Sequence, residues 1–275
     1  MIQESEIGSQ KSGFRSQRLE SRSKKKSCIL HVASCILLFA VFYGCAASDA
    51  SRKDDADIHY KIGVVHLNEG NITAAMKELT NAVEKYHKDA SFHNALGLAY
   101  FAKGMHEDAV KHMKEATRIN PKFSDAHTNL AAVYLEKKEW DLAVAEANLA
   151  LADIFYTTPE FAYFNMGRAF YEKADYAKAE ESYKKAIESN PKYIVAYNNI
   201  GLTYMKMNRD KEAADMFELA VKNAPNYVDA HYRLGLVLIN LKDKKGAFNA
   251  FQEVIKLAPD SEMARSAKGY IDLLK

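Results

Sequence analysis

Small residues recur along the 275-residue chain at an almost constant spacing, and this repeat constrains the fold more than any other feature. Successive members are 34, 34, 36, 34 and 34 positions apart. An alanine follows each member 12 positions later, and seven positions after that stands another alanine, or in the last unit a valine. Small residues at a fixed period indicate helix pairs that approach too closely for larger side chains. The first members of the six units are Gly63, Gly97, Ala131, Gly167, Gly201 and Gly235.

Each unit also carries the marks of two helices. Counted from the small residue as position 0, position −4 holds histidine or tyrosine in every unit, and position +3 holds a large residue. These offsets trace one face of a helix. Near the end of four units stands a proline, which closes a second helix because it has no amide hydrogen and disfavours helical geometry in the residue before it. These prolines are Pro121, Pro191, Pro225 and Pro259.

Six such units in register resemble the tetratricopeptide repeat (TPR) family, and the resemblance covers residues 56–259. It implies an all-α fold: a right-handed TPR superhelix, or α-solenoid, of six helix-turn-helix repeats plus a C-terminal capping helix. The capping helix is expected at 261–275, because an array must cover its last apolar face. The repeats are expected at about 56–89, 90–123, 124–159, 160–193, 194–227 and 228–261.

The first 44 residues are predicted to be an N-terminal extension and a signal peptide. Residues 1–26 carry seven Lys or Arg and end in three lysines, and the apolar run 28–44 follows almost directly. That order is typical of a secretory signal. The run is short for a membrane span, which favours a cleaved signal over the alternative of a permanent anchor.

Cys45 follows the apolar run directly and resembles the lipidated cysteine of a bacterial lipobox, because small residues stand on both sides of it. The resemblance implies cleavage before Cys45 and lipid attachment to it. Ala46, where aspartate would signal retention in the inner membrane, favours the outer membrane. Phe42 departs from the leucine usual in the family, and the alternative is that Cys45 is merely the third cysteine of an apolar helix. Residues 45–55 are small and polar and are expected to form a lipidated tether.

Repeat three ends irregularly, with two extra residues before the next unit. Phe155 stands where other repeats have proline, and Thr158 followed by Pro159 is a good helix start. Together with the lipobox and the six repeats, this junction resembles the type IV pilus biogenesis lipoproteins known as pilotins (PilF/PilW/Tgl-like). The resemblance implies a non-enzymatic lipoprotein on the periplasmic face of the outer membrane, which binds secretin subunits and supports their localisation and assembly.

Two other functions of a TPR lipoprotein fit the same residues. One is a scaffold in polysaccharide export or outer-membrane protein assembly, whose partner would be another envelope component. The other is a general periplasmic chaperone. None of these functions needs a cofactor or a small-molecule substrate, and a nucleic-acid partner is not expected, because residues after 44 carry a net charge of about −2 and show no basic face.

No catalytic site and no metal site are predicted. Four of the nine histidines occupy position −4, where one ring per repeat cannot converge on an ion at the roughly 2.0–2.1 Å that zinc requires. His106 and His112 are interpreted as surface or rim residues. The sequence has no glycine-rich phosphate loop, no Gly-x-Ser-x-Gly motif and no cysteine after Cys45.

A second stripe on each first helix, at positions −6, −3, +1 and +4, is expected to line the concave face of the array. Its apolar character predicts a partner-binding groove, although neighbouring helices could cover it. Asparagines at position −2 could bond the backbone of an extended peptide, or bond within the array; they are Asn129, Asn165 and Asn199. The predicted groove residues are Tyr60, Val64, Leu67, Leu98, Phe101, Leu135, Phe161, Phe164, Tyr171, Leu202, Met205, Tyr232, Leu236 and Ile239.

Overall fold

The computed structural model describes residues 49–274, and within them every regular element is a helix. The chain divides into two units, Met1–Ile58 and His59–Lys275. A first helix occupies residues 49–68. The later helices are α2 (Ile72–Lys85), α3 (Ala90–Ala102), α4 (His106–Ile119), α5 (Ser124–Glu136), α6 (Trp140–Leu151), α7 (Pro159–Glu172), α8 (Tyr176–Ser189), α9 (Ile194–Lys206), α10 (Asp210–Asn223), α11 (Val228–Asn240), α12 (Lys244–Leu257) and α13 (Glu262–Leu274).

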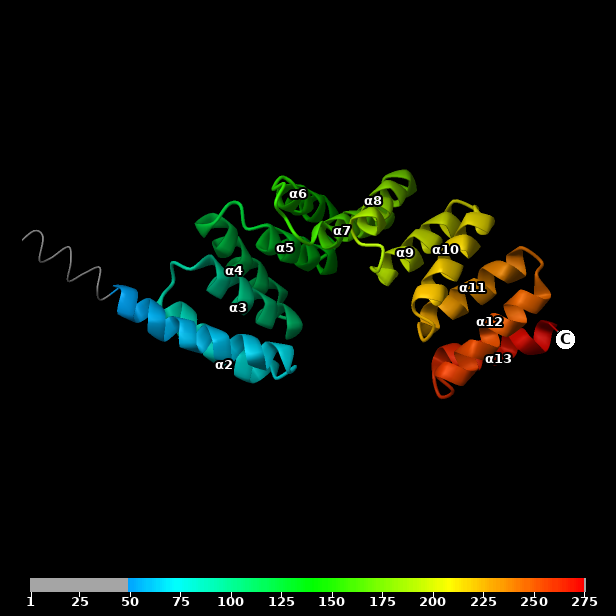
Figure 1. The fold of residues 1–275 in the computed structure, drawn as a ribbon, viewed down its shortest axis with the longest axis horizontal. Helices are drawn as coiled ribbons and strands as arrows, with labels where there is room; N and C mark the ends of the chain where they lie inside the picture. Colours follow the sequence, from blue (N-terminus) through cyan, green and yellow to red (C-terminus); the bar gives the residue numbers. More distant parts are fainter. Residues whose placement is uncertain (1–48, 275) are drawn as a thin grey trace, which may run out of the picture. The chain divides into compact units, whose positions relative to one another are not determined.

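Within the second unit, helices that follow one another in the sequence also pack against one another (Figure 1). The strongest contacts join the two helices of one repeat, such as α3 with α4 and α7 with α8, and weaker ones join each second helix to the next repeat. The first helices also touch at several places, as α5 touches α7. This order of contacts is that of an α-solenoid, so the predicted all-α repeat fold is confirmed.

The small residues lie where two helices of one repeat touch, as predicted. A Cβ added to Gly97 would lie 2.7 Å from Met113 Cγ, and one added to Gly201 would lie 2.6 Å from the ring of Phe217. The clashing side chain is always at position +16, and it is Leu, Met, Tyr, Phe or Phe in the five glycine repeats. Repeat three has Ala131 instead, and its position +16 is another alanine, Ala147. The small residue therefore makes room for one particular side chain of the second helix.

The turn between the two helices of each repeat uses a left-handed residue at position +7. Two of these residues are glycines, Gly70 and Gly104, for which a positive φ carries no steric cost. The other four are Lys138, Ala174, Asn208 and Lys242, with φ between 57° and 64°. The fixed position of this turn explains why the repeats stay in register.

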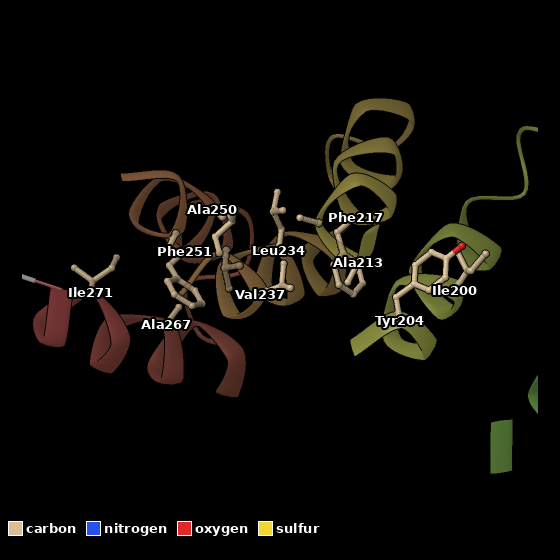
Figure 2. Close-up of a cluster of buried hydrophobic side chains, with 14 of the residues drawn as sticks. Ile200, Tyr204, Ala213, Phe217, Leu234, Val237, Ala250, Phe251, Ala267 and Ile271 are labelled. Atoms are coloured by element: carbon tan, nitrogen blue, oxygen red, sulfur yellow. The ribbon is translucent and has the colours of Figure 1, made fainter. Parts of the chain in front are cut away.

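The largest hydrophobic cluster runs through the C-terminal repeats, from α8 to α13. Figure 2 shows Phe217 and Phe251 pointing into it from the second helices, with Ala267 and Ile271 of α13 at its end. The ring of Phe251 stacks on that of Tyr270 at 5.2 Å. Helix α13 thus covers the last repeat, as expected for a capping helix.

The predicted lipidation site and signal lie outside the described residues, since both fall before residue 49. Residues 49–55, assigned to the tether by their polarity, belong to the helix at 49–68. They contain neither glycine nor proline, so nothing in their sequence interrupts a helix. In the part of the chain that the structure describes, no helix is long and apolar enough to cross a membrane.

Candidate functional site

A hollow of about 450 Å³ lies on the predicted stripe, across the first helices of repeats two, three and four. Helices α3, α5 and α7 form most of it, and the junction between α6 and α7 closes one side. Its lining mixes amide, hydroxyl and carboxylate groups with a few apolar side chains. The lining residues are Asn94, Leu98, Asp125, Thr128, Asn129, Ala132, Tyr156, Thr158, Phe161 and Asn165.

Amide side chains connect the three first helices at this hollow. Asn129 Nδ2 donates to Asn94 Oδ1 at 3.0 Å, and Asn165 Nδ2 donates to the Thr128 carbonyl at 3.1 Å. Within residues 49–274, Asn94 Nδ2 and Asn129 Oδ1 have no hydrogen-bond partner. The hollow therefore offers one open donor and one open acceptor from neighbouring helices, which is the chemistry that a peptide group can satisfy.

The irregular junction positions one wall of the hollow. Tyr156 Oη lies 2.9 Å from Thr128 Oγ1, and Asp153 accepts a hydrogen bond from the Phe155 amide at 2.9 Å. Burial raises the pKa of Tyr156, although its bond to Thr128 opposes this shift. The tyrosine is therefore neutral and able to hold the junction against α5. Two neighbouring side chains of the same turn, Ile154 and Phe155, point into solvent and are 88% and 82% exposed.

The aromatic residues predicted to cluster after the junction separate into two groups. Phe161 and Phe164 both make edge contacts with Tyr193, at 5.3 and 5.2 Å between ring centroids. Burial raises the pKa of Tyr193 to about 12. Tyr171 lies ten residues after Phe161, about 15 Å further along the helix, and packs on Tyr176. Only Phe161 of the predicted three lines the hollow.

The predicted groove is partly covered by its own repeats. Leu135 is only 2% exposed and packs in a core cluster with Val133 and Tyr134, so its assignment to the groove was wrong. Position +4 lies close to the second helix, and a leucine there reaches the core. Other predicted members are partly buried and pack against core clusters: Tyr60, Val64, Leu67, Leu98, Phe101, Phe164, Tyr171, Leu202, Met205, Tyr232, Leu236 and Ile239.

The predicted asparagine ladder extends over two repeats only. Asn129 and Asn165 line the hollow, whereas Asn199 Nδ2 donates to the Val195 carbonyl of its own helix at 2.8 Å. Asn94 and Thr128 were not predicted as site residues, although both stand at position −3 of the predicted stripe. Their signal in the sequence is a polar side chain at a position that faces the groove.

The ring at position −4 meets a different residue in neighbouring repeats. In repeat three, His127 Nδ1 contacts Glu146 Oε2 at 2.7 Å, while in repeat two His93 Nδ1 lies 3.2 Å from His112 Nδ1. Burial lowers the pKa values of His93 and His112, that of His112 to about 4. His112 thus faces a buried ring, which its assignment to the surface did not predict. Within residues 49–274, no three His, Cys, Asp or Glu groups gather so as to hold a metal ion.

Two protein-family models match this chain. A model described as TPR repeat matches residues 97–138 and 167–208, and one described as tetratricopeptide repeat matches residues 198–262. The matched segments together cover half of the chain. The chain belongs to the tetratricopeptide repeat family. No curated protein matches it in sequence.

Solved structures share the arrangement of this TPR protein. PilF of Pseudomonas aeruginosa has a TM-score of 0.70 and 17% identity, covering 80% of this chain and 99% of that one. PilW, described as a widely conserved type IV pilus biogenesis factor, has a TM-score of 0.73 and 17% identity, covering 78% and 98%. YrrB, a TPR protein with an unusual peptide-binding site, has a TM-score of 0.54 and 19% identity, covering 70% and 97%. At these identities the likeness is one of fold.

Proposed function

We propose that this TPR protein is a non-enzymatic pilotin, which binds a segment of the type IV pilus secretin and supports its assembly in the outer membrane. The observation that supports this proposal most directly is the hollow on α3, α5 and α7. It lies on a repeat array whose fold is similar to that of PilF and PilW over nearly the whole of those chains. Such a hollow suits a protein segment that makes both hydrogen bonds and apolar contacts with its walls.

The hollow favours an extended segment over a charged tail. Asn94 and Asn129 offer an open amide donor and an open acceptor, and Leu98 and Phe161 offer apolar contact. Asp125 is the only ionisable group of the lining besides Tyr156, and no lysine or arginine lines the hollow. An acidic terminus would therefore find no cationic partner there, whereas the backbone and apolar side chains of an extended peptide would be bound.

Anchoring through Cys45 is a separate part of the proposal. Small residues flank this cysteine directly after the apolar run, and a lipid there would hold the array on the periplasmic face of the outer membrane. Each buried methylene of an acyl chain contributes roughly 0.8 kcal/mol, so several chains would anchor the protein firmly. Metabolic labelling with a palmitate analogue should mark the wild type and should not mark Cys45→Ser. An unlabelled wild type that stays in the membrane fraction would contradict lipidation.

The test of the pilotin role uses a deletion strain. Membranes of this strain should lack the heat-resistant secretin multimer, and the wild-type gene should restore it. Leu98→Ser with Phe161→Ser should fail to restore it, because both side chains line the hollow. In alanine scanning, aromatic anchors in such sites often contribute about 2 kcal/mol or more to binding.

Val195→Ser provides the matched control for this experiment. Val195 stands at position −6 of its repeat, as Phe161 does, and the two are 39% and 42% exposed. It does not line the hollow, so its replacement should restore secretin assembly fully. Normal secretin multimers in the deletion strain would contradict the pilotin role. Full restoration by the double variant would place the contact elsewhere on the array, and equal loss in both variants would show that the loss is not specific to the hollow.

A further inference from the structure

The first repeat exposes a helix face that every later repeat buries. Ile62 and Val65 stand at positions −1 and +2, and they are 42% and 53% exposed. At position +2 the five later repeats have Ala99, Val133, Ala169, Thr203 and Val237, all of them 0% exposed. At position −1, four of the five later residues are no more than 8% exposed: Leu96, Leu130, Ile200 and Leu234.

The second helix of the preceding repeat covers these positions in the rest of the array. Leu96 and Ala99 pack with Leu79 of α2, and Leu130 and Val133 pack with Met113 of α4. Leu234 and Val237 belong to one cluster with Phe217 of α10. Among the described residues no helix precedes the one at 49–68. Ile62 and Val65 therefore stand at positions that the preceding repeat covers elsewhere in the array, but no such repeat covers them.

The two ends of the array differ in whether their terminal helix face is covered. At the C-terminal end, α13 buries Ala264 and Ile271 against the last repeat and turns Arg265 and Lys268 to solvent. Gly269 stands at position 0 of α13, and a Cβ added there would meet nothing. Apart from Leu273 near its end, which is 81% exposed, the outward face of α13 is polar, whereas the face with Ile62 and Val65 is aliphatic.

We infer that the face with Ile62 and Val65 is a second docking surface, which binds an amphipathic α-helix of a partner protein in the way that a preceding repeat would. Continuity with the five internal contacts carries this inference, because each of those contacts is made by a helix of that kind. The partner helix should present a small residue at the contact, since Ala116, Ala150 and Ala220 of α4, α6 and α10 are 0% exposed and cluster with alanines of the next repeat.

The sequence before residue 49 does not supply such a helix. Residues 1–26 have no apolar periodicity, and the run 28–44 has few polar residues, among them His31 and Ser34, so the sequence of neither segment shows the one apolar and one polar face of a covering helix. We therefore assign this face to a helix of another protein, and the test below distinguishes that helix from one of a second copy. This surface is separate from the hollow on α3, α5 and α7, and the inference does not depend on the pilotin role.

The test uses the full chain in mild detergent and a stapled, dye-labelled peptide with the sequence of residues 210–223. This is α10, the helix that covers Leu234 and Val237, an aliphatic pair of nearly the same size as Ile62 and Val65. Fluorescence anisotropy should show saturable binding. Ile62→Ser with Val65→Ser should weaken it at least tenfold, while Val195→Ser, an exposed valine on α9, should leave it unchanged.

Hydrogen exchange on the wild type locates the contact without any variant. The peptide should slow exchange at residues 59–68 and leave α9 and α11 unaffected. Absence of saturable binding, equal binding by the double variant, or protection elsewhere would overturn the inference. A dimer of the free chain that is lost in the double variant would also overturn it, because the occupant would then be a second copy.

Discussion

Repeats two and three share one register but differ in three features: the contact between their helices, the residue of their turn and the partner of the ring at position −4. Repeat two has Gly97 beneath a large Met113, while repeat three has alanine at both positions. Repeat two makes its left-handed turn with glycine, and repeat three with lysine. Repeat two pairs two histidine rings, and repeat three pairs a histidine with a glutamate. The backbone of a repeat therefore depends on matched pairs of residues and not on any single residue type.

The largest expected effect comes from breaking the match between positions 0 and +16. Ala147→Phe should overpack repeat three, because Ala131 already carries a Cβ where the repeats with phenylalanine have glycine. Overpacking of this kind costs about 1–3 kcal/mol. Adding Ala131→Gly should recover much of the loss, since Gly201 with Phe217 and Gly235 with Phe251 form that pair naturally. Urea unfolding of the two single variants and the double variant measures this coupling, and simple additivity would contradict the pairing.

The next effect is a pH dependence of opposite sign in the two repeats. Burial lowers the pKa values of His93 and His112. Their contribution to folding stability is therefore complete above the histidine pKa of the unfolded chain, about 6.5. It is lost as the pH falls toward the folded pKa of His112, about 4. For His127, burial opposes protonation, but hydrogen bonds to Glu146 and to the Pro121 carbonyl outweigh it and raise the pKa. The contribution of His127 to folding stability is complete below about pH 6.5, the pKa of an unfolded histidine, and is lost as the pH rises through its folded pKa.

His112→Glu tests this difference by giving repeat two the pair of repeat three. Native-state hydrogen exchange reports each repeat separately, which a global melt of a repeat array does not. Between pH 7.5 and pH 5, the wild type should lose on the order of 1 kcal/mol of local stability in α3 and α4, and α5 with α6 should not. In the variant this loss should disappear. An unchanged pH response of α3 in the variant would show that the two rings are not its source.

A smaller effect is expected at the turn. Lys138 has φ of 61° where repeat two has glycine with φ of 79°. Lys138→Gly removes the steric cost of the left-handed backbone but adds freedom to the unfolded chain, so we expect a net gain of only a few tenths of a kcal/mol, up to about 1. Gly104→Lys should change stability by a similar amount in the opposite direction. Thermal melts of both variants give the comparison, and two shifts of the same sign would refute it.

The smallest effect is expected for the ion pair that joins the two repeats. Lys137 Nζ lies 2.7 Å from Glu107 Oε1, but the Glu107 side chain is 83% exposed. Lys137 also lies 3.1 Å from Glu139 and keeps that partner when Glu107 is removed. Exposed pairs contribute little, so Glu107→Gln should leave the melting temperature and its salt dependence unchanged. A measurable loss at low salt would show that the repeats are coupled by charge.

The repeat fold could be predicted because its signal is the spacing of residues along the sequence. Six small residues in register place the helices, and the four prolines end them, without knowledge of any distant contact. The hollow was harder to predict, because it depends on which side chains of the predicted stripe stay open. Leu135 lies in the core, whereas the polar residues Asn94 and Thr128 line the hollow although the prediction rested on apolar residues alone. Histidine pairs across 19 positions, such as His93 with His112, join two helices whose relative rotation the sequence does not give.

The contact between repeats has a consequence for how such a chain can change over time. At position +19 every repeat but the last has an alanine with no exposed surface, and three of these alanines cluster with an alanine of the next repeat; the five are Ala82, Ala116, Ala150, Ala186 and Ala220. The other residues of this contact differ between repeats: position +2 is alanine, valine or threonine, and the side chains that pack on it from the preceding repeat include Leu79, Met113 and Phe217. A repeat that is duplicated, deleted or exchanged therefore keeps the alanine at its border but must fit its larger side chains to a new neighbour, and each such event inserts or removes one segment of the binding surface.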